Sequence, residues 1–220
     1  MNEEEGMMNA RNAFERRHMK ATLIQHSNRY TIIDWRREDG SGEYYCNFIV
    51  DKKRGSIIIS GDLGDCIATW YNELKVKDLA HYMRNTGYWT RKIQCSSNLY
   101  EIDSDDWMED FKDWYKDWFE DGDWLDEIVR HENPNLDLTE EDNLSEERDY
   151  QLEEFKDELE KSIISTESGD IFYPTDRMSE LMDIIDPDWY ENSFGRRYNP
   201  RIYLWGEGFY MACRQLDFVE

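Results

Sequence analysis

The 220-residue chain carries 50 acidic and 26 basic residues, which gives a formal net charge of −24 at pH 7. A protein with this charge repels nucleic acid, so we expect it to bind basic partners and not nucleic acid itself. Hydrophobic residues make up only 39% of the chain, but the aromatic fraction of 15% is enough to build a core, because each buried ring removes a large area from water.

The N-terminal part predicts a helix followed by an antiparallel meander. Apolar residues recur loosely among basic ones over residues 7–26, which favours an amphipathic helix. Aromatic and β-branched stretches separated by glycine-containing turns then indicate short strands. A second helix is expected over residues 77–85. The expected strands cover residues 29–36, 43–51, 56–60 and 65–71.

The excess negative charge is concentrated in one block. Residues 101–160 contain 26 acidic and 5 basic residues, a net charge of −21. Seven aromatic residues between positions 107 and 124 distinguish this block from a disordered acidic tail, which has no core to build. We therefore expect folded helices over residues 104–120, 124–131 and 145–164.

The first acidic helix carries an aromatic stripe beside an acidic one. The aromatic residues lie at i, i+4, i+7 and i+11, which predicts a single buried face: Trp107, Phe111, Trp114 and Trp118. Four aspartates repeat the same spacing one residue earlier: Asp106, Asp110, Asp113 and Asp117. Tyr115 and Phe119 fall outside the tryptophan face, and we interpret them as candidates for partner contact.

The C-terminal part returns to an ordinary composition. A helix is expected over residues 175–185 and is ended by Pro187, and residues 201–205 and 209–218 predict a hairpin around Gly206-Glu-Gly208. Two strands alone are marginal, so the hairpin is expected to complete the N-terminal sheet. The predicted class is α+β, with a sheet region at 1–100, an inserted acidic helical subdomain at 101–165, and a closing segment at 166–220.

Searches for catalytic motifs yield little. The sequence has no phosphate-binding glycine loop, no nucleophile elbow and no H-E-x-x-H motif. Asp62 or Asp65 followed by Glu73-Leu-Lys75 has the residue order of a metal-dependent nuclease site, but the acidic block would repel its substrate. We expect no enzyme activity, no cofactor and no metal. The cysteines are scattered without a C-x-x-C pair, which predicts reduced thiols.

Apolar runs are short throughout the chain. None approaches the roughly 18 residues of a membrane-spanning helix. The N-terminus is acidic and lacks the apolar segment of a signal peptide. A cytoplasmic protein without membrane contact is therefore expected.

A dense acidic face on folded helices is typical of a nucleic-acid mimic. Helical neighbours lie ~5–6 Å apart, comparable in scale to the charge spacing of a DNA strand. A solvated face that serves only solubility is the alternative. The carboxylates expected to contact a basic partner are Asp106, Asp110, Asp113, Asp117, Glu146, Glu147, Glu153, Glu154, Asp157 and Glu158.

Residues 53–71 carry a resemblance, most specific at Ser60-Gly-Asp-Leu-Gly64. This stretch resembles a group of uncharacterised proteins of phages and mobile elements in Gram-positive bacteria, over about the first 100 residues. No functional residues follow from the resemblance, but it implies a phage setting, in which small acidic proteins resemble anti-CRISPR proteins and restriction inhibitors. The expected function is a non-enzymatic inhibitor of a defence nuclease of the Cas9 kind. The alternative is a phage structural or regulatory protein that binds through Gly61–Gly64.

Overall fold

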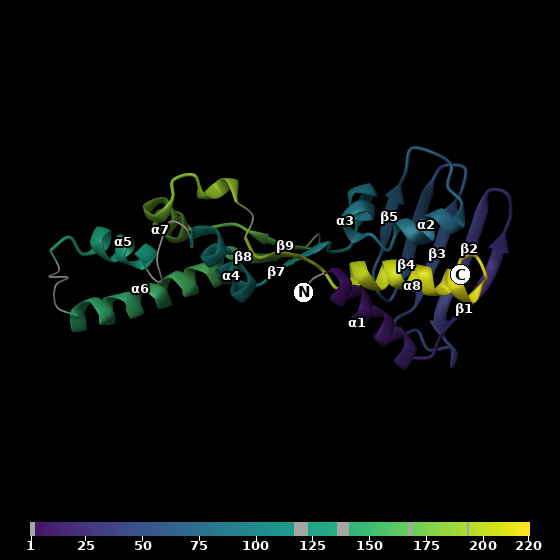
Figure 1. Ribbon diagram of the computed structural model, residues 1–220, viewed down its shortest axis with the longest axis horizontal. Helices are drawn as coiled ribbons and strands as arrows, with labels where there is room; N and C mark the ends of the chain where they lie inside the picture. The colour runs from purple at the N-terminus through teal and green to yellow at the C-terminus, as the bar shows by residue number, and fades with distance from the viewer. Residues whose placement is uncertain (1–2, 117–122, 136–140, 167–168, 193) are drawn as a thin grey trace. The chain divides into compact units, whose positions relative to one another are not determined.

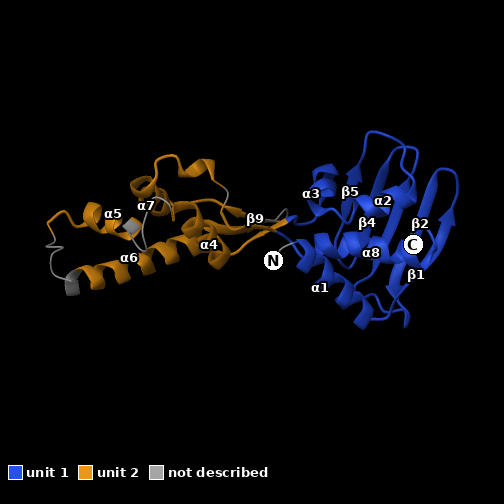
Figure 2. Ribbon diagram, viewed as in Figure 1, with its two compact units in different colours: residues 1–99, 198–220 blue, residues 100–197 orange. Residues whose placement is uncertain are grey.

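The computed structural model describes residues 3–116, 123–135, 141–166, 169–192 and 194–220 (Figure 1). The chain divides into two compact units, which Figure 2 colours separately. Residues 1–99 and 198–220 form one, here called the sheet unit, and residues 100–197 form the other, here called the acidic unit. The segment 166–197, which the sequence analysis assigned to the first domain, therefore belongs to the acidic unit.

The sheet unit contains a six-stranded antiparallel sheet with its strands in chain order. The four predicted strands and their antiparallel meander are confirmed, with Phe48 paired to Ile33 on one side and to Ile59 on the other. The strands are β1 (Met19–His26), β2 (Tyr30–Arg37), β3 (Cys46–Asp51), β4 (Ser56–Gly61), β5 (Cys66–Thr69) and β6 (Ile93–Ser96). The shorter helices of this unit are α2 (Val76–Tyr82), α3 (Thr86–Trp89) and the 3-10 turn η1 (Thr90–Lys92). An α+β fold results.

The predicted helix over residues 7–26 is wrong in its second half. The chain forms α1 (Glu3–Arg16), reverses at His18, and continues as β1. His18 has a φ of 50°, a left-handed conformation that ends the helix. In β1, Met19 and Ala21 are buried while Lys20 and Thr22 are exposed. This alternation is the two-residue period of a strand, and it overlaps the weak helical period of the same residues.

The predicted C-terminal hairpin is also wrong, because residues Arg201–Gln215 form one helix, α8. A Cβ atom on Gly206 would lie 2.4 Å from the backbone oxygen of Met83, and one on Gly208 would lie 3.1 Å from the Phe14 ring. The two glycines therefore allow close packing of a helix and do not mark a turn. The sheet is covered by α8 and is not extended by it.

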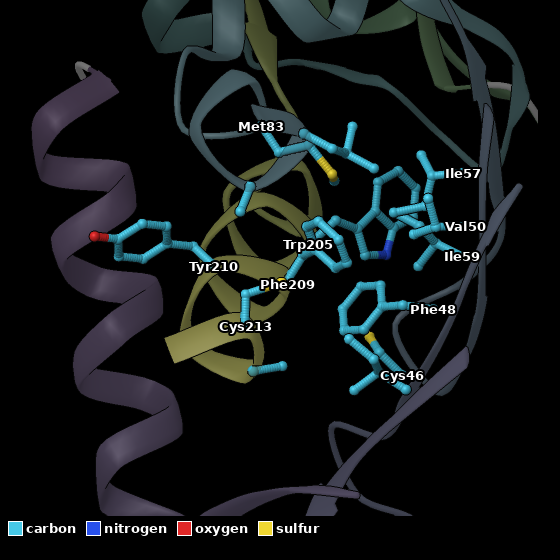
Figure 3. Packing of buried hydrophobic residues seen from close by; sticks show 14 of the residues in the cluster. Cys46, Phe48, Val50, Ile57, Ile59, Met83, Trp205, Phe209, Tyr210 and Cys213 are labelled. Carbon is cyan, nitrogen blue, oxygen red and sulfur yellow. The ribbon is translucent and has the colours of Figure 1, made fainter. Parts of the chain in front are cut away.

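The core of the sheet unit lies between the sheet and α8. Alternating residues of β2, β3 and β4 are fully buried, among them Trp35, Phe48 and Ile57. Figure 3 shows Trp205 and Phe209 of α8 directed toward the side chains of β3 and β4. The Phe209 and Phe48 rings lie 5.2 Å apart in an edge-on arrangement, which is a favoured geometry for aromatic pairs.

The acidic unit is built mainly from helices, and the predicted helices at 104–120, 124–131, 145–164 and 175–185 are each represented. Asp103 caps the first by accepting from the backbone N–H groups of Asp105 and Asp106. Thr175 caps the last, because its side-chain oxygen accepts from the backbone N–H of Met178. The elements are β7 (Tyr100–Ile102), α4 (Ser104–Tyr115), α5 (Asp123–Glu132), α6 (Glu141–Ser162), β8 (Ile163–Thr166), β9 (Gly169–Phe172), α7 (Asp176–Ile185), η2 (Trp189–Glu191) and β10 (Arg196–Tyr198).

Aromatic residues form the core of the acidic unit, with one correction to the predicted face. Trp107 and Phe111 are fully buried and stack at 5.3 Å, and Phe155 of α6 contacts both rings. The face then continues to Tyr115, which is 1% exposed, while Trp114 is 58% exposed. The Tyr115 hydroxyl donates to Asp186 at 2.6 Å, so Tyr115 is a core residue and not a contact residue. Trp118 and Phe119 lie outside the described residues.

Candidate functional site

The two units differ sharply in charge. The acidic unit contains 34 acidic and 9 basic residues, a net charge of −25, whereas the sheet unit contains 16 acidic and 17 basic residues, a net charge of +1. The entire net negative charge of the protein thus resides in residues 100–197. A surface with this charge attracts basic partners and speeds their association.

Two of the predicted contact carboxylates are engaged inside the acidic unit by one arginine. Asp110 of α4 accepts hydrogen bonds from both terminal nitrogens of Arg197, at 2.7 and 2.8 Å, and from the backbone N–H of Gly195 at 2.8 Å. Asp106 lies 3.6 Å from Nε of the same guanidinium. The Arg197 guanidinium and the Gly195 N–H hold the pKa of Asp110 below its ordinary value. These contacts tie α4 to β10 and to Gly195, which directly precedes that strand.

Glu154 of α6 is engaged in the same way. Its two oxygens accept from Nε and Nη2 of Arg177, each at 3.0 Å, which is the bidentate geometry that gives strong charge-assisted hydrogen bonds. Arg177 also donates to Glu132 at 3.2 Å. The hydrogen bond from Arg177 lowers the pKa of Glu132. Arg177 therefore joins α5, α6 and α7.

Two further predicted contact residues serve internal contacts. Glu147 accepts from the side-chain amides of Asn133 at 2.8 Å and Gln151 at 3.0 Å. Glu158 accepts from Lys161 at 2.7 Å and from the Thr175 hydroxyl at 2.6 Å, and these bonds lower its pKa. Its side chain is only 14% exposed. Neither carboxylate is free to act as a phosphate substitute.

The remaining predicted carboxylates lie at the surface. Asp113, Glu146, Glu153 and Asp157 are exposed, and Asp117 lies outside the described residues. Three of the exposed residues share one face of α6 with two that the sequence analysis did not select, Asp149 and Glu160. We define the α6 stripe as these five exposed residues: Glu146, Asp149, Glu153, Asp157 and Glu160.

The spacing of the α6 stripe is i, i+3, i+7, i+11 and i+14, which keeps the five carboxylates on one side of the helix. At 1.5 Å per residue they extend over about 21 Å. Glu153 pairs with Lys156 at 3.1 Å and Asp157 with Lys161 at 2.6 Å. The other three form no ion pair with any described residue. The spacing was present in the sequence, and burial of the neighbouring Phe155 and Leu159 identifies the outward side.

The proposed nuclease residues do not assemble into a metal site within the described part of the chain. Glu73 accepts two hydrogen bonds from Lys53, each at 2.9 Å, and Asp62 accepts from the backbone N–H of Tyr44. No group of three or more metal-ligating side chains occurs among the residues that the structure describes. Glu73 and Lys75 lie before α2 and not on a strand.

The Gly61–Gly64 turn has a backbone explanation. Gly61 has a φ of 143° and Gly64 a φ of 88°, values that residues other than glycine rarely adopt. A Cβ atom on Gly61 would lie 2.3 Å from the backbone oxygen of Tyr45. The backbone of the β4–β5 connection therefore accounts for the two glycines of this turn.

Buried thiols offer no nucleophile near neutral pH. Burial raises the pKa of Cys46 and Cys66 to about 12, so both stay protonated. Cys213 is buried as well, and its pKa is raised for the same reason. Cys95 is exposed, and all four are free cysteines.

No helix in the described residues combines the length and the apolar character needed to cross a membrane. The candidate site is the charged surface of the acidic unit, together with the exposed α6 stripe. A scan against protein-family models, a search of curated proteins and a search of solved structures each return no match.

Proposed function

We propose that this protein is a phage-encoded, non-enzymatic inhibitor of a host defence nuclease, which acts in the bacterial cytoplasm. Its acidic unit occupies a basic groove that normally binds nucleic acid, and an effector of the Cas9 kind is the proposed target. The observation that carries the proposal is the confinement of a net charge of −25 to one folded unit, while the other unit of the chain has a net charge of +1.

Solubility alone does not require this charge. A net charge of about 2–8 in magnitude suffices for a small domain. The acidic unit exceeds that range several-fold and keeps exposed carboxylates at helical spacing, although like charges at i and i+4 destabilise a helix. Glu146, Asp149 and Glu160 form no ion pair with a described residue, and a partner that neutralises their charges would offset this cost.

Rigidity also favours a mimic over a solvated face. Buried aromatic side chains of α4 and α6 pack against one another beneath the acidic surface. Arg177 joins α5, α6 and α7, and Arg197 joins α4 to β10. The α6 stripe presents roughly one carboxylate per 5 Å of helix. One strand of DNA presents one phosphate per ~3.4 Å of axis.

The test is a DNA-cleavage assay with guide-loaded Cas9 and, in parallel, a restriction endonuclease. A stripe variant carries Glu146→Lys, Asp149→Lys, Glu153→Lys and Glu160→Lys. A matched control places the same charge change on exposed residues of the sheet unit: Glu15→Lys, Glu38→Lys, Asp65→Lys and Glu220→Lys. Wild type and control are expected to inhibit cleavage, and the stripe variant is expected to lose at least 10-fold in potency. Equal potency of the two variants would overturn the role of the α6 stripe.

A further inference from the structure

A pocket in the acidic unit has five aromatic residues among the eleven that line it. Its volume is about 420 Å³, within the range of about 300–1,000 Å³ for ligand sites. Its lining draws on β7, α4, β9 and the segment around η2. The aromatic members of the lining are Trp107, Phe172, Trp189, Tyr190 and Phe194.

Two of these rings form a fixed corner. Phe172 and Trp189 have centroids 6.1 Å apart and planes at 85° to each other. The Trp189 indole N–H donates to Asp183 at 2.8 Å, which holds the ring in place. Tyr190 beside it also lines the pocket and is 64% exposed, so its ring is accessible to a ligand. Aromatic rings attract cations through their electron-rich faces.

The polar members of the lining include one carboxylate and one cation. Asp170 accepts from the Ser165 hydroxyl at 2.7 Å and weakly from the Ile102 N–H at 3.4 Å, which leaves acceptor capacity on both oxygens. The cation is Arg196, and its guanidinium carbon lies 3.6 Å from the centroid of the Tyr100 ring. The guanidinium of Arg196 is thus already stacked on a ring that does not line the pocket.

We propose that this pocket binds an arginine side chain of the basic partner. The guanidinium would stack on the aromatic walls and donate hydrogen bonds to Asp170. Arginine fits better than lysine because its planar, weakly hydrated group stacks on rings and pairs with carboxylates. The net charge of −25 on the unit favours a cation at this position over a neutral or anionic ligand. The inference rests on the proposed function and adds an anchor to the α6 stripe.

Anchors of this type dominate binding energy in protein interfaces. Arginine and aromatic residues are enriched at positions where truncation costs most, and these positions are well packed and shielded from water. A carboxylate stripe steers and speeds association. A pocket that accepts one side chain of the partner would add a packed contact at a single defined position.

The experiment titrates N-acetyl-arginine N-methylamide into the full-length ¹⁵N-labelled protein and follows the tryptophan indole N–H signals. Trp189→Phe assigns the Trp189 signal. We expect this signal to shift with a dissociation constant on the order of 1 mM. The matched neutral ligand, N-acetyl-citrulline N-methylamide, is expected to bind at least 10-fold more weakly. Equal binding of the two would overturn the cation site, and no Trp189 shift at all would overturn the pocket.

Variants separate a binding role from a structural one. Tyr190→Ala and Asp170→Asn are each expected to weaken the arginine ligand at least 5-fold while the remaining indole signals keep their positions. Tyr71→Ala in the sheet unit, 98% exposed, is the control and is expected to change nothing. Unchanged binding in both pocket variants would contradict the proposal.

The failure of this inference is distinguishable from failure of the proposed function. If the stripe variant loses inhibition while Tyr190→Ala inhibits fully and the arginine ligand does not bind, the pocket inference fails and the function stands. If the wild-type protein inhibits neither nuclease, the function fails, and the titration still measures whether the pocket takes a guanidinium group.

Discussion

Arg197 donates two hydrogen bonds to Asp110, from Nη1 at 2.7 Å and from Nη2 at 2.8 Å. The pair joins residues 87 positions apart in the chain, so it fixes α4 against the end of the acidic unit. The same carboxylate accepts from the backbone N–H of Gly195. An acidic residue that looks like a contact residue in the sequence is in fact part of the unit's internal framework.

Asp110→Asn is therefore expected to destabilise the protein by about 1.5–3 kcal/mol, because it removes the charge from three hydrogen bonds. Asp113→Asn is the matched control on the same helix. Asp113 is 78% exposed and lies 3.8 Å from Lys116, so its replacement is expected to change stability by less than about 0.5 kcal/mol. Urea unfolding followed by circular dichroism measures both. Equal effects would contradict the internal role of Asp110.

Tyr115→Phe tests the corrected core face of α4. The substitution removes the hydroxyl that donates to Asp186 at 2.6 Å in a buried position. Leaving that acceptor without its donor is expected to cost about 1–3 kcal/mol. Trp114→Phe, at a 58% exposed position, is expected to cost less than about 0.5 kcal/mol. Thermal unfolding by calorimetry compares them, and a larger loss at Trp114 would restore the face predicted from the sequence.

Gly206→Ala tests the packing of α8. The new methyl group would meet the backbone oxygen of Met83 at 2.4 Å, and overpacking of this kind is expected to cost about 1–3 kcal/mol. Gly87 in α3 is the control, because its nearest atom to an added Cβ is 3.9 Å away. Gly87→Ala is expected to be neutral or stabilising by up to about 1 kcal/mol. Denaturant unfolding measures the stability of both variants. An unchanged free energy of unfolding in Gly206→Ala would contradict the close packing of Gly206 against Met83.

Glu207 and Asp110 are expected to respond to acid in opposite directions. Glu207 of α8 is fully buried, and burial raises its pKa despite hydrogen bonding with Arg11. Its folded form takes up a proton before the unfolded form does, so its contribution to stability rises as the pH falls toward 4.5. The pKa of Asp110 is lowered, so its contribution is full above 3.8 and is lost as the pH falls below that value.

The measurement is the difference in unfolding free energy between wild type and each variant across this pH range. Relative to Glu207→Gln, the wild type should gain stability on acidification from pH 7 to 4.5. Relative to Asp110→Asn, it should lose its advantage as the pH falls further. A pH-independent difference for either variant would contradict the corresponding pKa shift.

The local features of the fold follow from the sequence because their causes are local. Alternation and glycine turns locate β2 to β5, and Asp103 and Thr175 mark helix starts as capping residues. The C-terminal helix was missed because Gly206 and Gly208 have the composition of a turn. Their actual role depends on Met83 and Phe14, which are distant in sequence. No local pattern contains that information.

The candidate site shows the same limit. The charge block and its helices are visible in the sequence, but the sorting of carboxylates into internal and exposed ones is not. Glu154 is internal because it accepts a hydrogen bond from Arg177, which is 23 residues away in the chain. Asp110 is internal because it accepts one from Arg197, 87 residues away. Counted from Trp107, Trp114 is at i+7 and Tyr115 at i+8. A helical period allows either position to continue the buried face, and the predicted face used Trp114 where the structure uses Tyr115. Only the partner of the Tyr115 hydroxyl decides between them.

The most direct test of the central claim is competition between this protein and target DNA for one groove. Binding of labelled target DNA to guide-loaded Cas9 would be measured by fluorescence anisotropy at rising concentrations of the protein, at 50 and 200 mM salt. The account predicts that wild type and the sheet-unit control displace DNA fully at low salt and less at high salt, and that the stripe variant does not displace it. Simultaneous binding of DNA and the wild-type protein would contradict the account.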